Sequence, residues 1–224
     1  MCGKFTAKAS WSEILDYIWT TPRADDDADR TLAYRVMNPL PVVLLDIATG
    51  RRRMVPMRWG FPDPKDWRRP QPIHARAETI DTVKAFAQAF RDGQRGIVWM
   101  KNFNEAPDVD GPVVQHVIEP QGVLAAAVIW RRFEVPGGPE PFFACVLATV
   151  PANRLIRGLP TDRMPAFVER QDLPLWLGET PAGLEEVKAC LKTVEGPGWT
   201  MNRQERAKST RRGKPVVSEP TGLF

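Results

Sequence analysis

Three short apolar runs constrain the fold of this chain more than any other feature of its sequence. They lie at Ile97–Met100, Val123–Trp130 and Phe142–Ala148, and each is a nearly unbroken stretch of aliphatic, aromatic or small side chains. Runs of this length between polar segments are typical of buried strands. We therefore expect them to form the interior strands of a sheet or barrel, with the weaker run Val113–Ile118 as a fourth.

A turn signal at Thr49-Gly50 separates two more strand-like runs, Val42–Leu45 and Met54–Trp59, and predicts a β-hairpin. Apolar residues recur at helical spacing in four other segments. These are Trp11–Ile18, which overlaps a capping box, Val83–Phe90, Leu173–Leu177 and Leu184–Leu191. Strands mixed with short helices in this way predict one β-rich α+β domain.

We expect that domain to cover residues 1–195 and a basic tail to cover residues 196–224. The tail contains glycine and proline and has little apolar periodicity, which favours a mobile or surface-lying segment. The chain as a whole is 43% hydrophobic and 26% charged, which excludes intrinsic disorder as its general state. It has no apolar run of membrane-spanning length and no secretory signal, so we expect a cytoplasmic protein without membrane contact.

Cysteine and histidine are too few for a disulfide framework or a structural metal site. The chain has three cysteines without paired spacing and two histidines, so we expect no metal and no cofactor. Cys145 lies in a strand-like run and Cys190 in a helical pattern, and both are interpreted as inert packing residues. His116 is interpreted as a residue on a strand face, without a chemical role.

Cys2, the third cysteine, is expected to become the first residue, because Met1 precedes a small side chain and is expected to be removed. An N-terminal cysteine carries an amine and a thiol on adjacent carbons, and both are nucleophilic near neutrality. With an aldehyde, such an aminothiol forms an imine that the thiolate closes into a thiazolidine. Judged alone, however, the position favours a small residue at a frayed chain end.

Positive charge is clustered at Arg51–Arg53, at Arg68–Arg69 and in the tail, although the net charge of the chain is only +4. Such clusters are compatible with contact to a polyanion. They are equally compatible with a solvated surface.

Four separated segments carry a resemblance to a known family. They are Met1–Phe5; Arg58–Pro62 with Trp67 and Ala75–Thr79; Phe103–Glu105; and Leu147–Asn153 with Arg163–Pro165 and Trp176–Leu177. In this order they resemble the SRAP family, the SOS-response-associated peptidase-like proteins that bind abasic DNA, over about residues 2–180. The resemblance implies a single α+β domain with a β-barrel-like core, flanking helices and a positively charged cleft.

The resemblance also implies an activity. In this family the processed N-terminal cysteine, here Cys2, captures the aldehyde of an abasic site in single-stranded DNA as a thiazolidine crosslink. Glu105 matches the family's catalytic glutamate, which would shuttle protons during imine formation. Arg76 and Arg163 match arginines that bind the phosphates beside the lesion.

Three further residues are candidates for contact with DNA. Lys4 and Thr149 are lesser candidates for phosphate binding. Trp67 would stack on a base near the lesion, because aromatic stacking tolerates any sequence. Packing in the core is an equally good interpretation of this tryptophan.

The chain departs from the family at two positions near the expected chemistry. His74 replaces an asparagine, and Asp162 replaces a histidine that is thought to assist the Schiff-base chemistry. One hypothesis is that the imidazole has moved, so that His74 transfers the proton and Asp162 orients it. The alternative is a divergent protein that binds DNA or crosslinks slowly. Asn104, Ala106-Pro107 and Arg35 are smaller departures.

Three functions stay open on this basis. The first is a monomeric protein that crosslinks to abasic single-stranded DNA through Cys2. The second is a cysteine peptidase or autopeptidase that uses the same thiol. The third is a module that binds single-stranded DNA through Arg76, Arg163 and the tail without catalysis.

Overall fold

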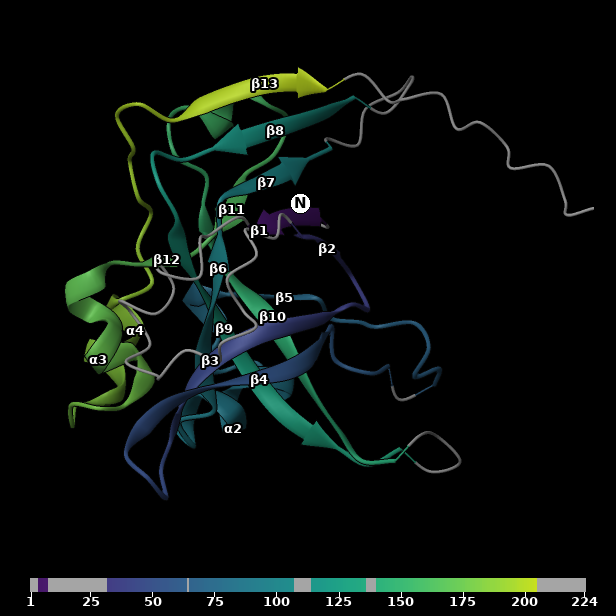
Figure 1. The fold of residues 1–224 in the computed structure, drawn as a ribbon, viewed down its shortest axis with the longest axis vertical. Helices are drawn as coiled ribbons and strands as arrows, with labels where there is room; N and C mark the ends of the chain where they lie inside the picture. The colour runs from purple at the N-terminus through teal and green to yellow at the C-terminus, as the bar shows by residue number, and fades with distance from the viewer. Residues whose placement is uncertain (1–3, 8–31, 64, 107–113, 136–139, 205–224) are drawn as a thin grey trace, which may run out of the picture.

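The computed structural model describes residues 4–7, 32–63, 65–106, 114–135 and 140–204. Two β-sheets make up most of it, and Figure 1 shows the smaller sheet above the larger one. The helix expected at Trp11–Ile18 lies outside the described residues. So does the expected tail from residue 205 onward.

The larger sheet contains a closed barrel of five strands. These are β3 (Pro39–Asp46), β4 (Arg51–Trp59), β6 (Arg95–Met100), β9 (Leu124–Phe133) and β10 (Phe142–Pro151). Pairing runs β10-β4-β3-β6-β9, and β9 pairs again with β10 to close the ring. All neighbours are antiparallel except β4 and β10, which are parallel. Closure leaves these five strands without a free edge.

The barrel interior is closely packed where β3 meets β6. Val43 of β3 lies opposite Ile97 of β6, and both are fully buried. A Cβ atom on Gly96 would lie 2.6 Å from a methyl carbon of Val42 and 2.8 Å from the carbonyl oxygen of Val43. Only glycine therefore allows the two strands to approach this closely.

The smaller sheet has five antiparallel strands in the order β13-β8-β7-β1-β2. They are β13 (Thr200–Gln204), β8 (Gln115–Glu119), β7 (Asn102–Glu105), β1 (Lys4–Ala7) and β2 (Leu32–Arg35). One face of this sheet carries an unbroken cross-strand row of apolar side chains. The row runs Met201, Ile118, Phe103, Phe5, Tyr34.

This apolar row fastens the smaller sheet to the barrel. The ring of Phe103 lies 6.0 Å from that of Phe167 on β12 (Phe167–Val168), a strand that pairs with β9. The ring of Phe5 lies 5.4 Å from that of Trp59 at the end of β4. The two sheets therefore share one apolar core.

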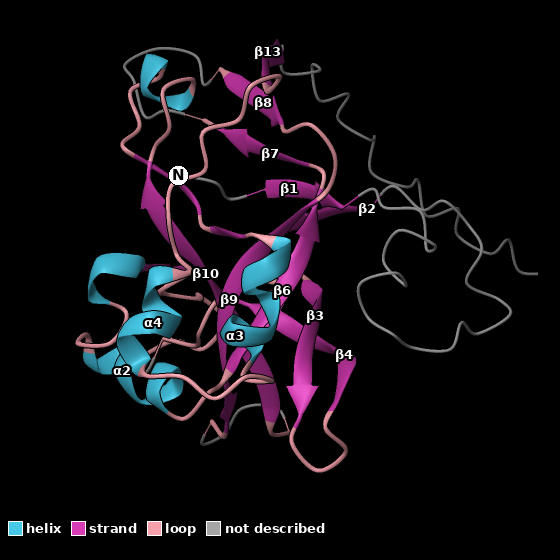
Figure 2. Cartoon of the chain, turned by 90° about the vertical axis from the view of Figure 1, so that its left-hand side faces the viewer, coloured by secondary structure: helices cyan, strands magenta, loops and turns pink. Residues whose placement is uncertain are grey.

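In the described part of the chain, three short helices lie outside the barrel strands (Figure 2). They are α2 (Lys84–Arg91), α3 (Leu173–Leu177) and α4 (Leu184–Ala189). The buried guanidinium of Arg95 joins α2 and α3 to the barrel, since its Nε donates to the carbonyl of Trp176 at 2.6 Å and its Nη1 to that of Phe90 at 3.1 Å. None of the helices in the described part of the chain has the length and apolarity to cross a membrane.

Five shorter elements complete the described fold. They are β5 (His74–Arg76), β11 (Arg163–Pro165) and the 3₁₀ turns η1 (Ala77–Thr79), η2 (Ile156–Gly158) and η3 (Arg170–Asp172). Strand β5 pairs in parallel with β10 just beyond the end of β4, and β11 pairs with the last residues of β10. Residues 74–76 and 163–165 are therefore held at the same end of β10.

The structure confirms the α+β class, the barrel-like core and the flanking helices. It also confirms the hairpin, the four apolar strands and the helices at Val83–Phe90, Leu173–Leu177 and Leu184–Leu191. It differs at the expected boundary, because Thr200–Gln204 forms β13 and pairs along all of β8. The ordered sheet therefore extends beyond residue 195, and the polar sequence of β13 fits an exposed edge strand.

Candidate functional site

Glu105 is the last residue of β7, and its side chain is completely buried, with 0% exposure. Glu105 follows Phe103 by two residues and lies on the same face of the sheet, next to the apolar row. His116 of β8 lies directly opposite Glu105, and Arg203 of β13 lies directly opposite His116. Glu105 is buried, His116 is half-buried and Arg203 is exposed, so this row leads from a buried carboxyl to the edge of the sheet.

The N-terminal strand β1 lies next to the strand that carries Glu105. Lys4 of β1 is opposite Asn104 of β7 on one side and opposite Arg35 of β2 on the other. Lys4 and Arg35 therefore place two cations side by side. They project from the face opposite to that of Glu105, because side chains alternate along a strand.

A chain of aromatic contacts leads from β1 to His74. Phe5 contacts Trp59, and the indole of Trp59 lies edge-on to the imidazole of His74 with ring centroids 6.3 Å apart. Trp59 also donates from Nε1 to the carbonyl of Ile73 at 3.2 Å, which fixes the start of β5. The structure thus brings His74 and the β1–β7 pair to one junction between the two sheets.

Arg76 lies two residues beyond His74 on the same face of β5 and is opposite Thr149 of β10. Its side chain is exposed, and within the described residues no hydrogen bond or ion pair holds its guanidinium. Thr149 is buried, with its Oγ1 3.5 Å from the carbonyl of Ala75. Of this pair, Arg76 is therefore the group with access to a phosphate.

Arg163 is only 6% exposed and is already engaged. Its Nη1 and Nη2 donate to the two carboxylate oxygens of Glu78 at 2.5 and 2.8 Å, and Nη2 also donates to the carbonyl of Thr149 at 2.5 Å. The hydrogen bond from Arg163 is the main reason that the pKa of Glu78 is lowered, against a smaller opposing effect of burial. In this state Arg163 fastens β11 to η1, and its contact with phosphate stays a prediction.

His74 and Asp162 are not brought together. His74 pairs with Leu147 of β10, whereas the carbonyl of Asp162 accepts a hydrogen bond from Ala152, five residues further along. That is roughly 17 Å at the rise of an extended strand. In addition, β5 and β11 flank opposite sides of β10, and Asp162 is exposed. Asp162 therefore does not orient His74 in this structure.

Trp67 lies half-buried in the loop that follows β4. The guanidiniums of Arg58 and Arg68 lie 5.7 and 5.0 Å from its ring centroid, and Arg58 also donates to the carbonyl of Trp67. Burial lowers the pKa of Arg58, which still remains a cation near neutrality. Trp67 is thus a half-buried residue in contact with two arginines and is not part of the buried core cluster. Its stacking on a base stays a prediction.

The three cysteines divide into two described thiols and Cys2, which lies outside the described residues. Cys145 is fully buried on β10, and burial strongly raises its pKa. Burial is also the main cause of the raised pKa of Cys190, followed by the nearby charge of Asp172. Neither environment favours a reactive thiolate.

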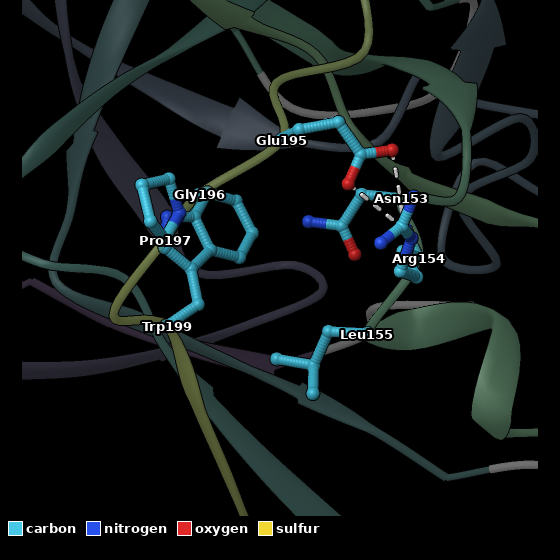
Figure 3. A pocket seen from close by; sticks show the side chains of 7 residues that line it. All are labelled: Asn153, Arg154, Leu155, Glu195, Gly196, Pro197 and Trp199. Atoms are coloured by element: carbon cyan, nitrogen blue, oxygen red, sulfur yellow. Dashed lines mark hydrogen bonds between the residues drawn. The ribbon is translucent and has the colours of Figure 1, made fainter.

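A cavity of about 710 Å³ lies elsewhere, beside the start of β13 (Figure 3). It is lined by Asn153, Arg154, Leu155, Glu195, Gly196, Pro197 and Trp199, none of which is a predicted site residue. Trp199 precedes Met201 by two residues and Arg203 follows it by two, so the cavity and the Glu105 row lie on opposite sides of the apolar row. The amide of Asn153 is used internally, donating to Val194 and accepting from Ile156.

Among the described residues, no group of three His, Cys, Asp or Glu side chains is arranged to hold a metal ion. The junction brings several chemically reactive side chains together. It offers a buried carboxyl, two imidazoles and a set of exposed cations. Such groups suit proton transfer next to a bound anion.

The fold and this junction define a closed β-barrel protein with a candidate acid–base site beside its N-terminal strand. The chain belongs to the SRAP family, because the family model described as SOS response associated peptidase (SRAP) matches residues 1–206. That family is named for the response to DNA damage. A comparison with curated proteins finds no match.

Solved structures with low sequence identity share the fold. A protein from Bacteroides thetaiotaomicron is 16% identical with a TM-score of 0.74, over 91% of this chain and 92% of its own. A protein from Bordetella bronchiseptica is 17% identical with a TM-score of 0.73, over 92% of this chain and all of its own. A phage-related protein from the same organism is 16% identical with a TM-score of 0.64, over 92% and 95%.

Sequence reasoning missed the row formed by Glu105, His116 and Arg203. His116 was correctly interpreted as a strand residue, but the sequence does not show that its strand pairs with β7 or that it lies opposite Glu105. The register between β7 and β8 depends on the connection at residues 107–113, whose length alone does not specify pairing. Arg203 was assigned to the tail, because β13 has four polar residues and a single apolar one, Met201, which is too few for an alternating pattern.

Proposed function

We propose that this protein captures abasic sites in single-stranded DNA by forming a thiazolidine between Cys2 and the ring-opened sugar aldehyde. Membership of the SRAP family supports the proposal. The structural observation that carries it is the burial of Glu105 on β7, the strand paired with β1. Cys2 precedes Lys4, the first residue of β1, by two positions in the sequence.

In the proposed reaction the amine of Cys2 adds to the aldehyde and forms a carbinolamine. Glu105 gives a proton to the hydroxyl group, which leaves as water, and a protonated imine remains. The sulfur then attacks the imine carbon, and its proton returns to Glu105. One aldehyde and one aminothiol thus yield one thiazolidine and one water, without an oxidant or cofactor.

DNA contact would involve the exposed cations at the junction. The exposed guanidinium of Arg76 suits a phosphate, and Lys4 and Arg35 add positive charge beside β1. His74 lies at the same junction and is the second candidate for proton transfer. Arg163 would support this surface by fixing Thr149 and Glu78.

The test is incubation with an oligonucleotide that contains one abasic site, followed by denaturing electrophoresis. We expect a shifted band with the wild type, no band with Cys2→Ala, and a wild-type yield with the buried control Cys145→Ala. Glu105→Gln is expected to slow band formation by roughly a hundredfold or more. Equal yields from wild type and Cys2→Ala would contradict the proposal.

The printed family description also names a peptidase. Intact mass would show whether Met1 is removed, which the proposed capture requires. Turnover of a peptide other than the protein's own leader would favour the peptidase alternative. Salt-sensitive binding to intact and abasic strands alike, unaffected by Cys2→Ala and without a covalent band, would leave a DNA-binding module.

A further inference from the structure

We propose that His116 is the positioning residue for Glu105: it orients the carboxyl and exchanges its proton with solvent at the edge of the smaller sheet. The inference rests on the proposed capture reaction and assigns a role to a residue outside the family resemblance. It concerns the row that joins Glu105 of β7, His116 of β8 and Arg203 of β13.

Register places His116 within reach of Glu105. Directly opposite residues of antiparallel strands have Cβ atoms about 4.5–5.5 Å apart on the same face of the sheet. An imidazole and a carboxyl at that separation can share a hydrogen bond after a change of side-chain torsion alone. The Nδ1 atom of His116 is buried and makes no hydrogen bond within the described part of the protein. It therefore has the capacity to accept or donate one.

Exposure to solvent increases along the row from Glu105 to Arg203. The carboxyl of Glu105 is completely enclosed, whereas Arg203 is exposed on the edge strand and His116 lies between them. A proton that moves along this row passes from the enclosed carboxyl to the exposed edge strand. Imidazole can accept a proton on one nitrogen and release one from the other, which makes His116 a suitable intermediate.

Proton balance shows where such an intermediate is needed. Glu105 must start protonated, becomes a carboxylate when water leaves, and regains a proton when the thiol adds. If the sulfur reacts as a thiolate, its proton is already in solvent and Glu105 must be reprotonated from there. His116 supplies that proton and recovers one from water, so the overall stoichiometry is unchanged.

The charged groups that face His116 are Glu105 on one neighbouring strand and Arg203 on the other. Arg203 keeps its charge throughout the working range of pH. Rates of capture that are compared across pH with and without the His116 ring therefore report on the pair Glu105–His116.

The experiment compares rates of crosslink formation from pH 5 to 9 for wild type and His116→Phe, a variant that keeps a ring but carries no exchangeable proton. We expect His116→Phe to be slower by roughly tenfold, less than the hundredfold typical of a direct general acid. We also expect the shape of its pH profile to differ from that of the wild type. Added free imidazole should partly restore the rate of His116→Gly.

A double variant separates this role from simple packing. Because His116 acts through Glu105, Glu105→Gln/His116→Phe should be no slower than Glu105→Gln alone. Glu119→Gln is the matched control, since it removes a titratable group from the same strand on the opposite face. It should keep the wild-type rate and pH profile.

The inference is overturned if His116→Phe retains the wild-type rate and pH profile, or if it slows Glu105→Gln as much as it slows the wild type. It is also overturned if a thermal unfolding scan shows that His116→Phe loses activity only by unfolding, while His116→Gly gains nothing from imidazole. A wild type that forms no crosslink would instead contradict the proposed function itself.

Discussion

At the scale of single residues, ion pairs divide the basic side chains into two groups. Arg163 is buried and paired with Glu78, and Arg52 forms a bidentate ion pair with Glu179. Arg76 and Arg35 are exposed. Since a guanidinium already paired with a carboxylate must lose that partner to bind phosphate, the exposed group is better placed for contact with DNA.

The pair Arg163–Glu78 predicts a pH-dependent stability. The Arg163 hydrogen bond holds the pKa of Glu78 below its ordinary value near 4.5 in the folded protein. The contribution of Glu78 is therefore complete above that value and is lost as pH falls through the lower folded-state pKa. Glu78→Gln should reduce the free energy of unfolding by about 1 kcal/mol near pH 7, because the carboxylate is half in water and partly screened.

The measurement is urea unfolding of wild type and Glu78→Gln at several pH values. The difference between them should shrink below pH 4.5 and vanish once Glu78 is protonated in the folded wild type. Glu134→Gln, which removes an exposed pair with Arg132, should cost less at every pH. A cost of Glu78→Gln that does not change with pH would show that its charge is irrelevant.

At the scale of elements, the barrel depends on the close approach of β3 and β6. Gly96→Ala should destabilise the fold by about 1–3 kcal/mol, because its methyl group would meet Val42 and the backbone of Val43. Gly158→Ala is the control, because open space surrounds Gly158 and its φ is not positive. Thermal unfolding would compare the two, and a smaller loss for Gly96→Ala would contradict the packing argument.

The same elements show how far the sequence alone can specify this fold. The apolar strands β6, β9 and β10 were predictable because their burial on both faces leaves an unbroken apolar run. The closure of β9 onto β10 was implied only by the family resemblance. Strand β13 was not predictable, since its polar residues are held by pairing with β8 rather than by burial.

The site shows a similar division. Glu105 was found because its motif resembles that of the family, and its burial agrees with an acid–base role. The proposed relation between His74 and Asp162 depended on their separation in space, which the sequence does not contain. His116 was overlooked for the same reason, because only the register with β7 places it opposite Glu105.

At the scale of the whole molecule, a net charge of +4 is modest, so the proposed binding to single-stranded DNA would depend on where exposed cations are grouped. Each phosphate that a cation neutralises releases counterions and adds about 0.7 to the slope of log affinity against log salt concentration. Arg76→Ala should therefore reduce the slope for an intact, abasic-free strand by about 0.7. Arg52→Ala should leave it unchanged, because Arg52 is paired with Glu179.

Fluorescence anisotropy between about 50 and 200 mM salt would measure these slopes without any covalent step. The Cys2→Ala background removes capture and leaves electrostatic binding. Equal loss of slope in Arg76→Ala and Arg52→Ala would mean that the whole basic surface attracts DNA without a defined track. A loss confined to Arg76→Ala would place the strand at the junction of the two sheets, beside β1.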